Sequence, residues 1–181
     1  MSILRVSAAM GLSSTTTLTI REDSVTPTVV AIFTAEAAGQ PMQSHATVEL
    51  AAGLGIAGDR YATRLGHWSD PRWRDQQLTL VSAELLDELG LAPGALRRNI
   101  VIRGIDLSDL IGLEFGIGDA RMQGRRICAP CGYIERLNDR PGLFAELAGR
   151  GGIRADVVGG GTIRLGDHLH ILGLGDEVRE D

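Results

Sequence analysis

The residues of this chain best suited to chemistry lie within one stretch of ten, Gly124 to Tyr133. This stretch holds both cysteines of the chain, Cys128 and Cys131, and two arginines directly before them, Arg125 and Arg126. A deprotonated thiol can act as a nucleophile or as a soft metal ligand, and a guanidinium can hold a planar anion. The simpler alternative is that both thiols are small buried side chains, which is common for free cysteines.

The two thiols are not expected to be equivalent. Pro130 favours an extended backbone at the residue before it, so Cys128 is predicted to end a strand. Apolar residues then recur at helical spacing from Tyr133 to Leu137, which places Cys131 at or next to the first turn of a short helix. The positive end of the helix dipole favours a thiolate there. Cys131 is therefore the better candidate for a nucleophile or a metal ligand.

Composition limits the class of protein. The chain has 181 residues, 44% of them apolar and 23% charged, as expected for one soluble globular domain. A net charge of -5 argues against a nucleic-acid partner, although every basic residue is arginine. No stretch has the length of a membrane span or the form of a signal peptide, so no membrane association is expected. Two cysteines this close cannot form a disulfide framework, which favours a cytoplasmic location.

The chain is predicted to contain a single domain with two tails. Residues 1–26 are polar and weakly patterned, and we expect a tail or an added edge strand. Residues 27–174 form the predicted domain. Residues 175–181 form an acidic C-terminal tail.

The domain alternates short strands with glycine-rich turns and single helices. Strands are expected at 28–34, 46–51, 77–81, 97–102, 114–118, 121–128, 153–158, 162–165 and 168–172, and helices at 83–89, 107–110, 131–137 and 143–147. The strands 153–158 and 162–165 are predicted to form a hairpin around three glycines. This pattern favours a mainly antiparallel β-barrel, closed or nearly closed, with a few short helices.

A glycine-rich stretch, Gly53 to Tyr61, has the spacing of a dinucleotide-binding loop. That motif requires a preceding strand, a following helix and a surrounding parallel βαβ unit. The segment after Gly58 is polar and irregular, so the glycines are more simply explained as a tight loop that presents Asp59 and Arg60. Another pair of arginines, Arg97 and Arg98, opens a later strand, where a solvated strand end is the simplest interpretation.

Taken in order, these pieces resemble the MOSC family, the domain named after the C-terminal part of molybdenum cofactor sulfurases. The matching stretches are Gly53 to Ala62, Gln77 to Val81, Arg98 to Ile100, Leu113 to Gly118, Gly124 to Tyr133, Gly149 to Val158 and Gly161 to Asp167. The resemblance covers most of residues 28–172. It implies that the glycine spacing belongs to the Gly-Asp-Arg loop of this family and not to a dinucleotide-binding motif.

The resemblance implies a barrel similar to the pyruvate kinase barrel domain, with a pocket for the molybdenum cofactor (molybdopterin). It also implies that Cys131 is the catalytic residue and the metal ligand, whereas Cys128 is not shared by every branch of the family. Arginines suit the phosphate of the cofactor, and Asn99 and Asp59 could bond its pterin edge. The candidate cofactor-binding residues are thus Asp59, Arg60, Arg97, Arg98, Asn99, Arg125, Arg126 and Cys128. The chain shows no pyridoxal phosphate site.

Two functions follow from the resemblance as expectations. The first is the reduction of small N-hydroxylated substrates, of the hydroxylaminopurine or amidoxime type, with electrons from a separate donor protein because the sequence has no flavin, haem or iron-sulfur motif. The second is a cofactor or sulfur (persulfide) carrier that works with a separate desulfurase. A zinc site formed by both cysteines with His168 and His170 is a further alternative, although the histidine spacing is unusual. A thioredoxin-like pair would need a βαβ context that the sequence lacks.

Overall fold

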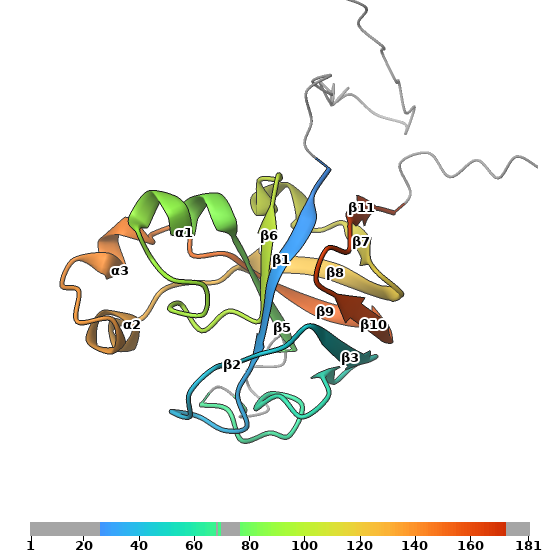
Figure 1. The fold of residues 1–181 in the computed structure, drawn as a ribbon, viewed down its shortest axis with the longest axis horizontal. Helices are drawn as coiled ribbons and strands as arrows, with labels where there is room; N and C mark the ends of the chain where they lie inside the picture. The colour runs from blue at the N-terminus through green and yellow to red at the C-terminus, as the bar shows by residue number, and fades with distance from the viewer. Residues whose placement is uncertain (1–25, 68, 70–76, 173–181) are drawn as a thin grey trace, which may run out of the picture.

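A computed structural model describes residues 26–67, 69 and 77–172 of the chain. The predicted tails, residues 1–26 and 175–181, lie outside these residues apart from residue 26. The elements in chain order are β1 (Thr28–Thr34), β2 (Gln43–Ser44), β3 (Thr47–Ala51), β4 (Gly55–Ile56), β5 (Leu78–Ser82), α1 (Ala83–Leu89), β6 (Ile100–Arg103), the 3-10 helix η1 (Leu107–Leu110), β7 (Glu114–Ile117), β8 (Ala120–Ile127), α2 (Gly132–Leu137), α3 (Leu143–Glu146), β9 (Ile153–Gly159), β10 (Gly161–Arg164) and β11 (Leu169–Ile171) (Figure 1).

The fold is mainly β, as predicted, and its strands form two sheets. The larger sheet has eight strands in the order β11-β7-β8-β9-β5-β6-β1-β2, and the smaller has the order β10-β3-β4. Among the paired strands, β5 and β6 run parallel and the other pairs are antiparallel. The parallel pair is joined through α1, the crossover that parallel strands require.

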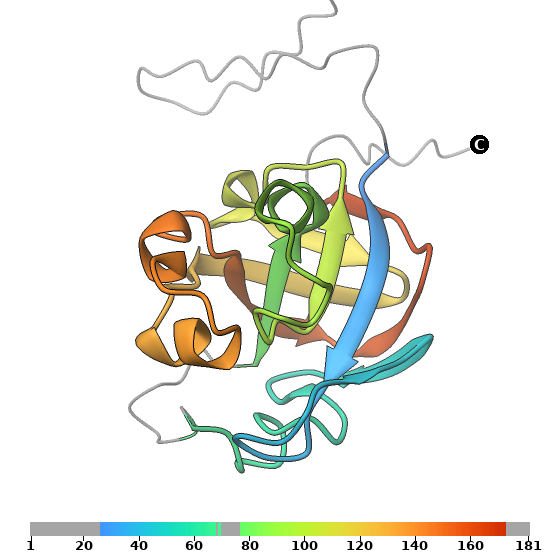
Figure 2. The same ribbon diagram turned by 60° about the vertical axis from the view of Figure 1, so that its left-hand side comes forward.

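The large sheet curls into an open half-barrel, so the prediction of a closed or nearly closed barrel is only approximately right (Figure 2). Its two end strands, β11 and β2, have three and two residues and do not pair with each other. Near the open side, a single bridge joins Thr28 to His168, and the N–H of Val29 donates to the carbonyl of Asp167 at 2.9 Å. These contacts join the start of β1 to the segment before β11, but they do not form a continuous ladder of hydrogen bonds that would close the barrel.

The predicted hairpin between β9 and β10 is wrong. Strand β9 pairs with β5 on one edge and with β8 on the other, so neither edge is available to the strand that follows it. The chain instead crosses to the small sheet, where Gly161 to Arg164 pair with Leu50 to Thr47. A Cβ at Gly160 would lie 2.8 Å from the carbonyl oxygen of Leu50, and this close approach of two backbones requires glycine.

The molecule has two apolar cores, on the two faces of β5 and β6. Leu80, Ile100 and Ile102 face the interior of the curled sheet, where Phe115 is fully buried. The alternate residues, including Val81, pack under the helices α1, α2 and α3, which lie together on one side of the sheet (Figures 1 and 2). Strands buried on both faces explain the continuous apolar runs of the sequence.

The predicted helix boundaries hold where capping signals are strong. Ser82 caps α1 by accepting a hydrogen bond from the N–H of Leu85 at 3.1 Å, and Gly90 ends the helix with a left-handed φ of 62°.

Within the described residues, no helix has the length and apolar character needed to cross a membrane.

Candidate functional site

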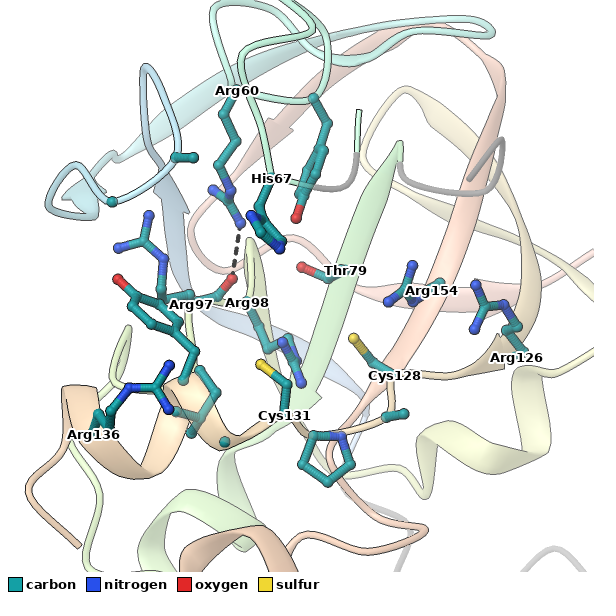
Figure 3. A pocket seen from close by; sticks show the side chains of 18 residues that line it. Arg60, His67, Thr79, Arg97, Arg98, Arg126, Cys128, Cys131, Arg136 and Arg154 are labelled. Atoms are coloured by element: carbon teal, nitrogen blue, oxygen red, sulfur yellow. Dashed lines mark hydrogen bonds between the residues drawn. The ribbon is translucent and has the colours of Figure 1, made fainter. Parts of the chain in front are cut away.

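A cavity of about 660 Å³ opens where several segments distant in sequence meet (Figure 3). Its volume lies in the range of small-molecule and cofactor sites. The described lining residues come from the loops after β1 and β4, from β5 and β9, from the turn before β6, and from the end of β8, α2 and the connection between them. They are Ala38, Gly39, Arg60, Tyr61, His67, Thr79, Arg97, Arg98, Arg126, Cys128, Ala129, Pro130, Cys131, Gly132, Tyr133, Ile134, Arg136 and Arg154.

Both thiols line this cavity, and each has the backbone position predicted for it. Cys128 follows the last residue of β8, is 3% exposed, and donates its N–H to the carbonyl of Gly152 at 2.7 Å. Cys131 is the N-cap residue of α2, with an extended backbone at φ -140° and a half-buried side chain that makes no capping hydrogen bond. Both cysteines are free, and Figure 3 shows both sulfur atoms on the cavity side.

Positive charge dominates the lining. Six arginines contribute to it, and among the described lining residues there is no aspartate or glutamate. Around the thiols, Arg126 and Arg154 lie on the side of Cys128, and Arg97 and Arg136 lie on the side of Cys131 (Figure 3). Cations gathered in a concave, partly desolvated space create a strong positive potential, so the cavity favours an anionic ligand.

Arg97 combines several unfavourable features. Its φ of 57° is in the left-handed region, which a residue with a side chain rarely adopts. Burial, and then the like charge of Arg60, lowers the pKa of Arg97 below its ordinary value. Nη1 donates to the carbonyl of Gln40 at 2.7 Å, but among the described residues the buried Nη2 has no hydrogen-bond partner. Such a group fits a site whose ligand supplies the missing acceptor.

Arg98 is fixed more firmly and also retains a donor. Its Nε donates to the carbonyl of Gly151 at 2.9 Å and its Nη1 to that of Leu96 at 3.1 Å. The residue is 9% exposed, and its Nη2 likewise has no hydrogen-bond partner among the described residues. Two anchored nitrogens hold the guanidinium in one orientation, so the third is preorganised for a ligand.

Asp59 and Asn99 lie behind the cavity and are not among the residues that line it. The carboxylate of Asp59 is fully buried, and its Oδ1 accepts from Arg60 Nη1 at 3.1 Å, from the N–H of Ala35 at 3.0 Å and from Asn99 Nδ2 at 3.2 Å. Asn99 Oδ1 accepts from Thr79 Oγ1 at 2.8 Å. These bonds hold Arg60 at the cavity, where its Nη2 donates to the carbonyl of Arg97 at 3.0 Å (Figure 3).

Arg125 also lies outside the lining, unlike its neighbour Arg126. Its Nε donates to Asp156 Oδ2 at 2.6 Å, and the side chain is 44% exposed. The register of β8 against β9 shifts between Gly124 and Arg126, so Arg125 is the extra residue of an irregular stretch and Arg126 is the residue paired with Arg154. Of the nine candidate residues, the structure therefore brings six together at the cavity, namely Arg60, Arg97, Arg98, Arg126, Cys128 and Cys131.

Sequence reasoning missed other lining residues, notably Arg154 and Tyr133. Arg154 is 8% exposed within the apolar strand β9, directly opposite Arg126 in the register of β8. An arginine inside a buried apolar strand was the available signal, because a charge in such a place requires a specific role. Tyr133 carried no comparable signal, since its spacing fits an ordinary apolar helix face.

The structure separates the residues of the hypothetical zinc site. His168 Nδ1 lies 3.1 Å from Thr28 Oγ1, and the ring of His170 covers Gly116, where a Cβ would lie 2.4 Å from Nε2. Neither histidine lines the cavity, and the described residues contain no group of three or more ligand side chains that could hold a metal. The four-ligand zinc hypothesis is therefore wrong.

The dinucleotide-binding alternative also fails. Gly55 and Ile56 form β4, which pairs with β3 in an antiparallel sheet, and the described residues that follow, up to position 67, form turns. A Cβ at Gly55 would lie 2.3 Å from the carbonyl oxygen of Gln77, so this glycine allows two backbones to approach closely.

Several solved structures share this fold, among them the following three. The YUAD protein from Bacillus subtilis superposes with a TM-score of 0.66 and 20% identity, covering 80% of this chain and 94% of its own. YiiM from Geobacillus stearothermophilus gives 0.63 and 17%, covering 83% and 77%. YiiM from Escherichia coli gives 0.57 and 20%, covering 80% and 69%. The comparison with curated protein sequences gives no significant match.

The family model described as MOSC domain matches residues 67–170. This range is more than half of the chain and contains both cysteines, the β5–β6 pair and five of the six arginines of the cavity. The expectation that the sequence motifs raised is thereby confirmed: the chain belongs to the MOSC domain family.

Proposed function

We propose that this protein binds the molybdenum cofactor in the arginine-lined cavity, with Cys131 as the protein ligand of the metal, and that it reduces small N-hydroxylated substrates. One observation carries the proposal. A half-buried thiol shares a cavity with two buried guanidinium groups, each of which retains a hydrogen-bond donor without a partner among the described residues. MOSC family membership is consistent with this cofactor.

The residues present fit the chemistry of that group. Molybdopterin brings its own dithiolene sulfurs to the metal, so one protein thiolate is sufficient, in keeping with the lack of a three-ligand cluster among the described side chains. The Nη2 groups of Arg97 and Arg98 suit its phosphate, since each can donate a charge-assisted hydrogen bond to an oxyanion. When bound, the cofactor supplies a redox-active metal that can accept an oxygen atom from an N–O bond.

The protein's own residues would orient the bound groups. Arg60 is held by the buried carboxylate of Asp59 and lies 4.7 Å above the ring of Tyr61, so its charge is fixed in place. Tyr133 and Arg136, from the first turns of α2, border the space that a small substrate would occupy next to Cys131. Electrons would come from a separate donor protein in the cytoplasm.

The test is to produce the full chain in a host that makes the cofactor and to measure bound molybdenum and released pterin. We expect both in the wild-type protein and in Cys128→Ser, and neither in Cys131→Ser. Loss of metal in Cys128→Ser with retention in Cys131→Ser would reverse the ligand assignment. A wild-type protein that cannot be loaded would exclude the proposed function.

A second candidate function is a carrier for the cofactor or for persulfide sulfur supplied by a separate desulfurase. It is favoured by the presence of two thiols in one cavity, since the buried Cys128 has no clear role in a one-ligand metal site. The loaded protein should be assayed with an artificial electron donor and an amidoxime or hydroxylaminopurine. Turnover that disappears in Cys131→Ala favours the enzyme, whereas a loaded but inactive protein favours the carrier.

A further inference from the structure

Cys131 is a thiol that small molecules can reach from the cavity. It is half-buried and its side chain makes no capping hydrogen bond at the start of α2. Cys128 is 3% exposed and its backbone is fixed to Gly152. A reagent that enters the cavity therefore meets Cys131 as the more accessible of the two thiols.

The surroundings of Cys131 select for negative charge. Arg97 and Arg98 are each 9% exposed, and each has a buried Nη2 with no hydrogen-bond partner among the described residues. The described lining has no carboxylate that could repel an anion. A carboxylate can accept a charge-assisted hydrogen bond from each of these Nη2 groups, so a disulfide that carries carboxylates should be concentrated next to this thiol.

We propose that, in the protein without cofactor, Cys131 is a modification site that forms mixed disulfides selectively with anionic disulfides, of which oxidised glutathione is the probe. The Cys131 thiolate attacks one sulfur of the disulfide, a new sulfur–sulfur bond forms, and the other half leaves as a thiolate that takes up the proton. One disulfide is consumed and one is formed, so no external oxidant is required.

The consequence concerns loading of the site. The mixed disulfide occupies the same sulfur that we propose as the metal ligand, so it would block that ligand until a reducing thiol removed the adduct. This modification goes beyond cofactor binding, because it depends only on the thiol and on the charge of the cavity. It would make the acceptance of cofactor sensitive to the redox state of small thiols.

The experiment uses the full chain produced without cofactor and three disulfides: oxidised glutathione (anionic), hydroxyethyl disulfide (neutral) and cystamine (cationic). Intact mass and peptide mapping give the rate and the site of modification. Each rate is divided by that of the same protein unfolded in urea, which removes the intrinsic reactivity of the reagent. We expect oxidised glutathione to exceed cystamine by about tenfold at low salt, with a smaller difference at high salt.

Matched variants locate the effect. Cys131→Ser should abolish the adduct and Cys128→Ser should keep it. Arg97→Gln should reduce the preference for the anion, while Arg125→Gln makes the same change in net charge outside the cavity and should leave the preference unchanged. If Arg97→Gln does not fold, the comparison of low and high salt on the wild-type protein still tests whether the preference for the anionic disulfide is electrostatic.

Three results would overturn the inference: equal normalised rates for all three reagents, an adduct on Cys128, or a Cys128–Cys131 disulfide as the product. None of them bears on the molybdenum content of the loaded protein, so a failure here is distinguishable from a failure of the proposed function.

Discussion

At the scale of single residues, the cavity retains groups that weaken the fold. Arg97 is buried, left-handed and next to Arg60, and it retains a donor without a partner among the described residues. Backbone strain and unsatisfied polar groups of this kind are typical of functional sites, where a ligand compensates for them. We therefore propose that the charge of Arg97 serves ligand binding and not the stability of the fold.

Arg97→Gly tests this explanation. Glycine accepts the left-handed backbone without strain, which offsets the loss of the hydrogen bond to Gln40, so the free energy of unfolding should change by less than about 1 kcal/mol. The molybdenum content after loading should fall at least tenfold. Denaturant unfolding and metal analysis measure the two effects. A large loss of stability with normal loading would assign Arg97 to the fold.

Asp59→Asn should lower the stability of the fold, in contrast to Arg97→Gly. Asp59 carries the carboxylate next to the buried guanidinium of Arg60, and removal of one partner from a buried pair costs about 3 kcal/mol or more. Urea unfolding should show this loss. The control is Asp87→Asn, which removes an exposed ion pair with Arg103 and should leave the unfolding midpoint nearly unchanged. Equal effects of the two substitutions would contradict the role of Asp59.

At the scale of elements, the turn between α3 and β9 positions the segment that carries both thiols. The carbonyl of Gly152 accepts the N–H of Cys128, and the carbonyl of Gly151 accepts Nε of Arg98. A Cβ at Gly151 would lie 2.8 Å from the carbonyl oxygen of Cys128. The two glycines therefore allow the loop, β5 and the cysteine segment to pack closely together.

Two glycine variants separate backbone strain from steric overlap. Gly149 and Gly152 both have positive φ, of 74° and 93°, but a Cβ would meet nothing within 4 Å at Gly149 and would lie 2.0 Å from the carbonyl oxygen of Leu80 at Gly152. Gly149→Ala should cost about 1 kcal/mol in urea unfolding. Gly152→Ala should cost clearly more and should increase the reactivity of Cys128 toward a thiol reagent. Similar losses in both variants would exclude the steric explanation.

At the scale of the whole molecule, stability and ligand binding should be coupled. The arginines of the cavity come from the loop after β4, the turn before β6, β8, α2 and β9, so an anion that binds them connects most of the fold. A ligand that binds only the folded state raises its stability by mass action.

Phosphate should therefore raise the melting temperature of the cofactor-free protein more than chloride does at equal ionic strength. The Arg97→Gln/Arg98→Gln double variant separates this site effect from the general stabilisation by phosphate salts, since it should respond to phosphate only to the general extent. Thermal unfolding monitored by circular dichroism measures both. An identical phosphate response of wild type and variant would contradict an anion site at these residues.

Much of the local structure could be predicted because it depends on neighbouring residues. Ser82 and Gly90 marked the ends of α1, and Pro130 marked the boundary between strand and helix that distinguishes Cys128 from Cys131. The prediction of a hairpin failed because strand pairing depends on which strand edge is free. Both edges of β9 are occupied, by β5 and by β8. Local propensity carries no information about such edges.

The sequence by itself determined the mainly β fold class, the family and the backbone positions of the two thiols, since these follow from short-range pattern and motif order. Only the tertiary structure decided which side chains share the cavity. It placed Arg126 in the lining and Arg125 against Asp156, moved Asp59 and Asn99 behind Arg60, and added Arg154 from β9. The physical reason is that strand pleat, register and curl set the direction of each side chain, and these are properties of the whole sheet.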